Sequence, residues 1–326
     1  MNPQNKHEQN STATRKPTIL LDTDIGNDVD DVIALCLLLR LAQLDKVNIA
    51  GVLVSNDCES AEHLVAAIFA YYGYSVPIYK VRNGVRGSPQ RYINTTLSRM
   101  DSRYQVDPEA SFSSHEWMKF IANGFDADSL SLVTIGFFTN VRRILDDNQS
   151  AELLDLVAKN SFHMAGNFKE LKREHNIMFA SDDFEKFLTK WKKPSVYCGF
   201  EQGLRVLFRQ SWLERLSDID PIHPLVIAYF AFRTTRYDRP CWDPVTVLVA
   251  CGLLDRFVSF SEPGTVELKW PNREPCTSFR TARGQYHRIV VINEGDELQI
   301  ENFIKCLLLG SDDECNLAIE AIKKNR

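Results

Sequence analysis

The chain has 326 residues, of which 44% are hydrophobic and 25% are charged, and its formal net charge is −5 at pH 7. A chain of this length and hydrophobic content can bury a large core. The acidic balance, without a long basic stripe, argues against a nucleic-acid-binding protein. We therefore expect no nucleic-acid partner. No apolar run reaches the length of a membrane-spanning helix, so we also expect no membrane association.

The first sixteen residues are polar and contain no apolar stretch of the kind found in signal peptides. We therefore expect a disordered tail over residues 1–16 and a single domain over residues 17–326. The eight cysteines are scattered and form no CxxC pair, and several lie within apolar runs. This usage is typical of a reducing compartment and predicts a cytoplasmic protein.

Strand-like and helix-like segments alternate along the chain. The predicted strands are 18–21, 47–55, 130–136, 161–166 and 195–200. The predicted helices are 32–41, 59–72, 139–147, 182–191, 224–234, 243–257 and 297–309. This order predicts an α/β fold with an open, mostly parallel sheet flanked by helices. Segments 267–270 and 287–292 suggest a small antiparallel excursion near the C-terminus, and 82–113 reads as a long loop or loop-helix region over the site.

The segment LLDTDIGNDVDDVIAL holds five aspartates within ten residues: Asp22, Asp24, Asp28, Asp30 and Asp31. They follow a predicted strand and precede a predicted helix, where an α/β sheet opens a crevice for ligands. One or two acidic residues would suffice to favour a helix start, and five exceed that need. So many carboxylates repel one another unless a cation neutralises them, and oxygen ligands favour Ca²⁺ or Mg²⁺.

Further polar residues stand near the ends of later strands and helices. They are Asn56, Asn167, Glu174, Asn176 and Asp243. Each alone is typical of a cap or a turn. Together they place amides and carboxylates on one predicted rim, which suits a polyhydroxylated ligand such as a sugar beside a divalent ion.

These motifs resemble those of the nucleoside hydrolases, the inosine–uridine-preferring N-ribohydrolase superfamily. DTDIGNDVDDVIAL is similar to the family signature DTDPGxDDAxAL, and GVLVSN, IGFFTNV, HMAGN, EHN and WDPV follow in the family's order. The resemblance implies bound Ca²⁺ and hydrolysis of the N-glycosidic bond of a ribonucleoside or related riboside, giving ribose and free base. We also expect a homo-oligomer, a dimer or tetramer, that acts in purine or pyrimidine salvage.

The resemblance also implies individual roles. Asp24 matches the metal ligand that deprotonates the attacking water, and the other metal ligands match Asp31, Asp243 and the backbone carbonyl of Ile135. The residues that match ribose-binding groups are Asp30, Asn56, Asn167, Glu174, Asn176 and Asp243. Asp22 and Asp28 are expected to support the loop, with Asp28 an alternative to Asp30 because the loop is two residues longer than the family signature.

A second departure from the family concerns the leaving base. Trp242 stands where purine/pyrimidine-type members of the family carry a histidine, which in those members is associated with protonation of the leaving base. A tryptophan here either stacks on the base or belongs to the core. The candidates for the base side are therefore Trp242, His223 and Tyr237, whereas alternation would point His175 away from the sugar.

Two other functions remain open. The DxD spacing of Asp22 and Asp24 also occurs in haloacid dehalogenase-type phosphatases, although Gly26 stands where those proteins carry threonine or valine. The other alternative is a catalytically silent sugar or nucleoside binder that keeps the fold and the metal.

Overall fold

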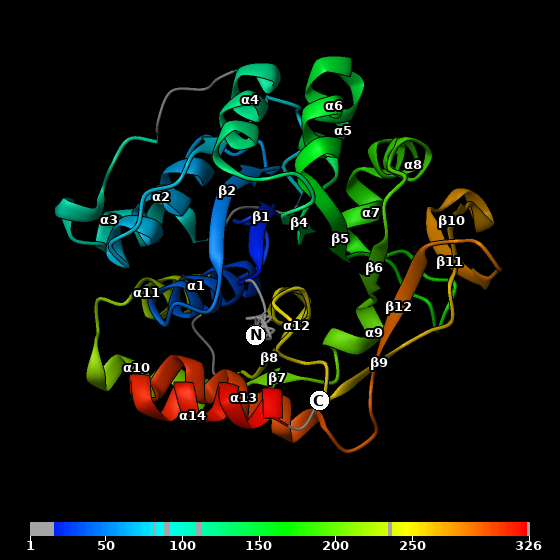
Figure 1. Ribbon diagram of the computed structural model, residues 1–326. Coiled ribbons are helices and arrows are strands. Elements are labelled where there is room, and N and C mark those ends of the chain that lie inside the picture. The colour runs from blue at the N-terminus through cyan, green and yellow to red at the C-terminus, as the bar shows by residue number, and fades with distance from the viewer. Residues whose placement is uncertain (1–15, 81, 88–91, 109–112, 234–236, 325–326) are drawn as a thin grey trace, which may run out of the picture.

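Helices cover both faces of an open, mostly parallel β-sheet (Figure 1). The computed structural model describes residues 16–80, 82–87, 92–108, 113–233 and 237–324. The predicted N-terminal tail lies almost entirely outside the described residues. Within them, no helix is both long enough and apolar enough to cross a membrane.

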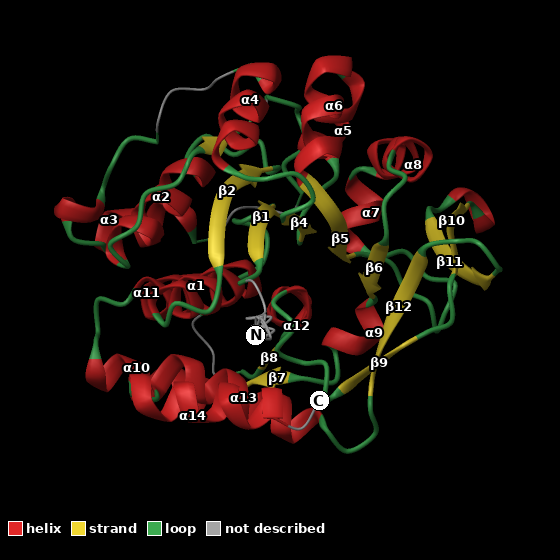
Figure 2. Cartoon of the chain, viewed as in Figure 1, coloured by secondary structure: helices red, strands yellow, loops and turns green. Residues whose placement is uncertain are grey.

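Helices separate the strands as far as residue 258, whereas the last four strands follow one another with only a 3-10 turn among them (Figure 2). The strands are β1 (Thr18–Thr23), β2 (Asn48–Val54), β3 (Ile78–Tyr79), β4 (Leu130–Thr134), β5 (Ala158–Met164), β6 (Ser195–Cys198), β7 (Leu207–Phe208), β8 (Arg239–Pro240), β9 (Val258–Phe260), β10 (Gly264–Lys269), β11 (Cys276–Thr281) and β12 (His287–Ile292).

The helices are mostly short, and the longest helices within the described residues are α1, α13 and α14. Their bounds are α1 (Asp30–Gln43), α2 (Ala61–Tyr71), α3 (Ile93–Arg99), α4 (Ser114–Gly124), α5 (Thr139–Asp146), α6 (Asn148–Val157), α7 (His175–Phe179), α8 (Ser181–Lys190), α9 (Phe200–Gly203), α10 (Gln210–Ile219), α11 (Pro224–Phe232), α12 (Trp242–Ala250), α13 (Glu297–Leu309) and α14 (Asp312–Lys324). Two 3-10 turns are η1 (Ser102–Tyr104) and η2 (Pro271–Arg273).

The main sheet confirms the predicted fold class. Its strand order is β11-β10-β12-β6-β5-β4-β1-β2-β3 within the described residues, and β9 pairs with β12. The neighbours from β3 to β12 pair in parallel, whereas β9, β10 and β11 form the antiparallel part. The segment 287–292, which we expected in the antiparallel excursion, also joins the main sheet as β12, parallel to β6.

Successive side chains of the central strands pack alternately into two apolar cores, one on each face of the sheet. Ile19 and Leu21 of β1 pack into the core formed with α1, α2, α11, α12 and α13. Leu20 points to the opposite core, which α4, α5, α6 and α8 cover. Because both faces of β1 are covered, Ile19, Leu20 and Leu21 form a continuous apolar run, as is usual in parallel strands.

Gly136 holds the turn after β4 against the turn after β1. A Cβ atom at this position would lie 2.3 Å from the backbone nitrogen of Asp24 and 2.6 Å from the Ser55 hydroxyl oxygen. The neighbouring Ile135 N–H donates to the Asp22 carbonyl at 2.7 Å. Only a residue without a side chain allows this close backbone approach. Gly136 therefore sets the position of the aspartate loop relative to β4.

We expect Gly136→Ala to lower the free energy of unfolding by at least roughly 1–3 kcal/mol, because the new methyl group meets backbone atoms that cannot move aside. The matched control is Gly124→Ala at the end of α4, where nothing lies within 4 Å of the new Cβ. The control should stay within about 0.5 kcal/mol of the wild type. Urea unfolding measures both, and equal midpoints for the two variants would contradict this account of the turn.

Candidate active site

A cavity of about 240 Å³ opens at the carboxyl ends of the parallel strands. Its walls come from the segments that follow β1, β4, β5 and β6, and from the first residues of α1, α7 and α12. The lining residues are Asp24, Asn27, Asp28, Asp30, Asp31, Ile135, Met164, Glu174, His175, Asn176, Phe200, Arg239, Trp242 and Asp243. The edge of the sheet is the one expected for a ligand site in an open α/β fold.

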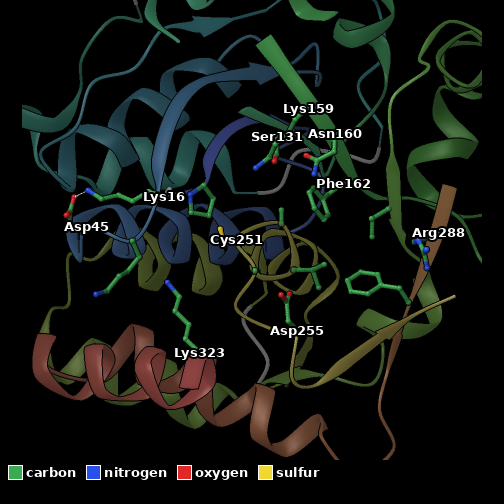
Figure 3. A pocket seen from close by; sticks show the side chains of 17 residues that line it. Lys16, Asp45, Ser131, Lys159, Asn160, Phe162, Cys251, Asp255, Arg288 and Lys323 are labelled. Carbon is green, nitrogen blue, oxygen red and sulfur yellow. Dashed lines mark hydrogen bonds and ion pairs between the residues drawn. The ribbon is translucent and has the colours of Figure 1, made fainter. Parts of the chain in front are cut away.

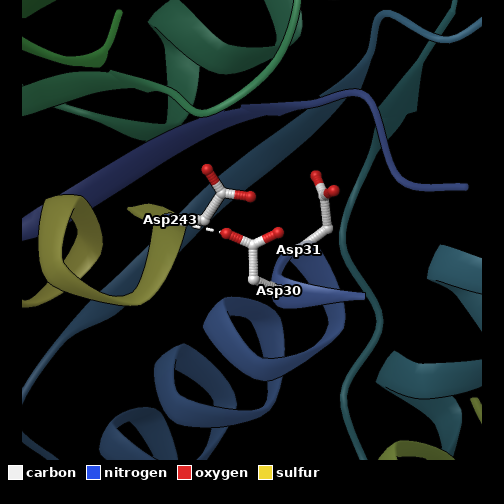
Figure 4. A group of neighbouring side chains, drawn as sticks. All are labelled: Asp30, Asp31 and Asp243. Carbon is white, nitrogen blue, oxygen red and sulfur yellow. Dashed lines mark hydrogen bonds between the residues drawn. The ribbon is translucent and has the colours of Figure 1, made fainter. Parts of the chain in front are cut away.

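Three buried aspartates meet at this cavity. One carboxylate oxygen each from Asp30, Asp31 and Asp243 lies within 4.8 Å of the others (Figure 4). Asp30 and Asp31 stand at the start of α1, and Asp243 stands in the first turn of α12. The Asp30 carboxylate accepts a hydrogen bond from the Asp243 backbone N–H at 3.3 Å. The structure thus brings together two segments that lie 213 residues apart in the sequence.

Burial makes this arrangement electrostatically costly. It raises the pKa of Asp30, Asp31 and Asp243 well above the usual range, and the neighbouring carboxylates raise each pKa further. Carboxylates this close cannot all ionise in a buried site without a compensating positive charge. Three oxygen donors with no sulfur or nitrogen among them fit a hard divalent cation. These residues therefore suit the metal that the sequence predicts.

Asp24 lines the same cavity, although it is not one of the three clustered carboxylates. Its Oδ2 accepts a hydrogen bond from the Asn27 side-chain amide at 2.6 Å. The amide of Asn56 donates to the Asp24 backbone carbonyl at 3.2 Å and to that of Ile25 at 3.1 Å. Burial raises the pKa of the Asp24 carboxyl to about 7, and the charge of Glu174 contributes to the rise.

Glu174 and Asn176 also line this cavity. The Glu174 carboxylate caps α7 by accepting from the backbone N–H groups of Asn176 at 2.8 Å and Ile177 at 3.3 Å. Burial raises the pKa of Glu174 to about 7 despite these hydrogen bonds. The Asn176 amide donates to the backbone carbonyl of Ile135 at 3.3 Å, so this carbonyl lies beside the residues of the cavity wall.

The aspartate loop is clamped from outside. The Tyr92 hydroxyl donates to the Asp28 carbonyl at 2.6 Å and accepts from the Gly26 N–H at 2.8 Å. The Asp28 carboxylate forms an ion pair with Arg239. Asp22 is fully buried beneath the loop, and burial raises its pKa well above the usual value.

Four of the residues predicted to bind the ribose or face the base do not line the cavity. Asn56 braces the backbone of the aspartate loop, and the Asn167 side chain accepts from the Glu170 N–H at 3.0 Å. His223 caps α11 by accepting from the Leu225 N–H at 3.2 Å, and it contacts a different cavity.

Tyr237, the fourth of these residues, stacks on Tyr229 with ring centroids 4.9 Å apart. His223 thus lies away from the aspartates of the candidate site. Tyr237 does not line the cavity, but it lies near Asp30: burial raises the Tyr237 pKa, and the charge of Asp30 contributes to the rise.

Trp242 does line the cavity, where it forms an aromatic wall with Phe200. The two rings stack with centroids 5.3 Å apart and an interplanar angle of 22°. The indole N–H donates to the Phe200 carbonyl at 2.9 Å. A flat apolar face of this kind suits an aromatic ring as its partner.

Sequence reasoning missed several lining residues. His175 was expected to point away from the sugar because of strand-like alternation, but α7 begins at this residue, so the spacing is helical and His175 lines the cavity. Arg239 and Phe200 belong to β8 and α9, which are too short to show a hydrophobic period in the sequence. The acidic cluster was itself a signal that a basic side chain should lie nearby.

A larger cavity, of about 630 Å³, lies at the opposite edge of the sheet, near the amino ends of β1 and β5 (Figure 3). Lys159, Arg288 and Lys323 are among its charged lining residues. It contains none of the predicted site residues, so size alone does not identify the candidate active site.

Comparison with known proteins agrees with the geometry. The family model described as "Inosine-uridine preferring nucleoside hydrolase" matches residues 19–301. The chain belongs to this family. The structure is also similar to a plant nucleoside hydrolase, with a TM-score of 0.68 and 14% identity over 91% of this chain and 100% of that one.

Two further solved structures have the same fold. An inosine-uridine preferring nucleoside hydrolase from Bacillus anthracis has a TM-score of 0.66 and 16% identity over 89% of this chain and 99% of that one. An inosine-guanosine nucleoside hydrolase has a TM-score of 0.66 and 16% identity over 90% and 99%. No curated protein sequence matches the chain. The family resemblance seen in the motifs is thus confirmed, and the chain is a nucleoside hydrolase-like N-glycosyl hydrolase.

We expect Tyr92→Phe to destabilise this nucleoside hydrolase by roughly 1–3 kcal/mol, because the buried Gly26 N–H loses its acceptor. The same change should lower the affinity for a divalent ion, since the loop that carries Asp24 and Asp30 loses its clamp. Tyr74→Phe, at a half-buried ring beyond α2, is the control and should leave both quantities unchanged. Thermal unfolding with and without calcium measures the effects, and matching curves for both variants would contradict the clamp.

Proposed function

We propose that the protein is a calcium-dependent N-ribohydrolase that cleaves a ribonucleoside or related riboside into ribose and free base. The observation that supports this most is the buried triad of Asp30, Asp31 and Asp243 beside Asp24. A site of this composition needs a hard cation, and the remaining amide and carboxylate groups can hold sugar hydroxyls.

We propose Asp24, Asp31, Asp243 and the Ile135 carbonyl as the calcium ligands. Asp31 and Asp243 belong to the triad, and Asp24 and Ile135 line the same cavity. Asp30 lies close enough to the other two triad carboxylates to share in this role. Calcium bound there would neutralise the carboxylates and lower the pKa of a neighbouring water.

Asp24 is the proposed general base. It takes a proton from the attacking water as the water oxygen approaches C1′ of the ribose. Its pKa of about 7 in the absence of a cation reflects burial, and a cation beside it would lower that value. The side-chain amide of Asn27 donates a hydrogen bond to Oδ2 of Asp24, which fixes the orientation of the Asp24 carboxylate.

The ribose hydroxyls have several partners available. Asp30, Glu174, Asn176 and Asp243 line the cavity, and these are the proposed ribose-binding groups. Asn56 and Asn167 do not line it, so we propose for them only an indirect role through the loops they brace. Fixed carboxylates beside the ring would also favour the positive charge that the sugar develops as the bond breaks.

The alternatives receive less support. Membership of the nucleoside hydrolase family removes the reason for a phosphatase of the haloacid dehalogenase type. A silent binder is not favoured, because the cavity keeps the carboxylates that the chemistry needs. We further propose that the protein is a homo-oligomer and acts in nucleoside salvage. We also propose a cytoplasmic location, which is in line with its eight free cysteines.

Calcium should stabilise the protein more at about pH 8 than at about pH 5. The triad pKa values are raised in the folded state, so well below the ordinary aspartate pKa of about 4 both states are protonated and these groups do not lower the stability. As the pH rises, the unfolded chain ionises first, and the metal-free protein loses stability until the folded pKa values are passed. Bound calcium removes that loss.

Thermal unfolding in chelator and in calcium measures this difference, and elemental analysis should find about one calcium per chain. The variant Asp31→Asn removes one of the repelling carboxylates and should flatten the pH dependence of the metal-free protein. Zinc in place of calcium, or melting curves that ignore the chelator at both pH values, would refute the proposed cofactor.

Asp24→Asn should lower ribose release by roughly 10²–10⁴-fold, because the amide cannot accept a proton. A reducing-sugar assay over a panel of ribonucleosides, with the matching 2′-deoxyribonucleosides, measures the rate and the need for the 2′-hydroxyl. Asp107→Asn, at an exposed side chain outside the cavity, is the matched control. A variant that binds calcium and still works at the wild-type rate would remove Asp24 from the role of base.

A further inference from the structure

The position that carries a histidine in family members cannot donate a proton to the leaving base here. Trp242 has a single N–H, and the Phe200 carbonyl already accepts it at 2.9 Å. The indole therefore has no free N–H to offer the base. Another group has to stabilise the base as it leaves.

The negative charge of the cavity makes it more important that some group stabilises the leaving base. Six carboxylates line it: Asp24, Asp28, Asp30, Asp31, Glu174 and Asp243. A base that leaves with extra electron density enters a strongly negative environment, and the proposed calcium lies among the aspartates at the ribose end. Among the described lining residues, Arg239 is the only lysine or arginine.

Arg239 is held firmly beside the aromatic wall. Its guanidinium carbon lies 5.0 Å from the Trp242 ring centroid and 5.6 Å from that of Phe232. It forms an ion pair with Asp28, while its buried Nε has no hydrogen-bond partner. Burial lowers the Arg239 pKa to about 10, so the group still carries its charge near neutral pH. A buried donor without a partner is costly, and such donors in a cavity indicate a ligand acceptor.

We propose that Arg239 takes over the task of the missing histidine by binding the leaving base against Trp242 and stabilising its negative charge. This inference rests on the proposed hydrolysis. As the C1′–N bond breaks, its electron pair stays on the base nitrogen, and the guanidinium stabilises the resulting anion. Water gives its hydroxyl oxygen to C1′ and its proton to Asp24, and the released base then takes a proton from solvent.

A rigid guanidinium fork matches an edge of the base that carries two acceptors, such as the O6 and N7 atoms of a 6-oxopurine. Because the charge is permanent, this mode of activation does not need a titrating acid. Preorganised charge at a site of developing negative charge is worth about 10²–10³ in rate when a single donor is removed. Arg239 should therefore matter most for bases that are poor leaving groups.

The test compares inosine with p-nitrophenyl riboside, whose leaving group departs as a stable anion without help. Arg239→Gln should lower kcat/KM for inosine by about 10²-fold or more, and that for the activated riboside by less than about tenfold. Arg239→Lys keeps the charge but loses the fork, and should lie between the wild type and Arg239→Gln. Calcium content and melting temperature confirm that each variant is folded.

Two matched variants separate the alternatives. Asp28→Asn breaks the ion pair but keeps Arg239, and should leave the ratio of the two substrates near the wild-type value. If Arg239→Gln and Asp28→Asn instead lower the rates for both substrates by the same factor, Arg239 acts only by bracing the loop and the proposal is wrong. His175, whose buried Nε2 also lacks a partner, is the competing donor. An inosine-selective loss in His175→Phe, with none in Arg239→Gln, would likewise overturn it.

Failure of the hydrolase proposal looks different from failure of this one. If the wild type releases ribose from neither substrate, the proposed function is wrong and Arg239 is not at issue. If the wild type cleaves both and Arg239→Gln changes the two rates equally, the function stands and the role of Arg239 is refuted.

Discussion

Repulsion among buried carboxylates is the constraint on which the site depends. Asp30, Asp31 and Asp243 hold oxygens within 4.8 Å of one another at almost complete burial, with Asp24 and Glu174 lining the same cavity. Among the lining residues that the structure describes, Arg239 is the only lysine or arginine, and it already pairs with Asp28. A fold that keeps these groups together loses stability at a site whose carboxylates could hold a metal ion.

The rest of the structure serves to hold that arrangement in place. Parallel strands with apolar residues on both faces fix the turns that follow β1 and β4 side by side, and Gly136 lets them touch. Helix α12 packs against α1, which brings Asp243 to the other two aspartates. Tyr92 reaches the loop from a part of the chain with little regular structure. The acidic site is therefore a product of tertiary packing and does not form within one local segment.

Much of this followed from the sequence, because the informative patterns are local. Alternating apolar segments indicated the parallel sheet, and five aspartates in ten residues indicated a cation site. The position of Asp243 at the start of a predicted helix placed it on the same rim, and the family resemblance gave it the role of a metal ligand. The residues at the part of the cavity that would face the leaving base were not predictable in the same way. Arg239 lies on a two-residue strand, and His175 was misplaced because a five-residue helix has too few turns to show a period.

The most direct test of the account is a crystal structure of the protein grown with calcium. The account predicts a single ion between Asp31 and Asp243, about 2.3–2.6 Å from their carboxylate oxygens, with Asp24 and the Ile135 carbonyl within the same coordination sphere. Clear density for the three clustered aspartates at saturating calcium, with no ion between them, would contradict the central claim that this fold is built around a divalent cation.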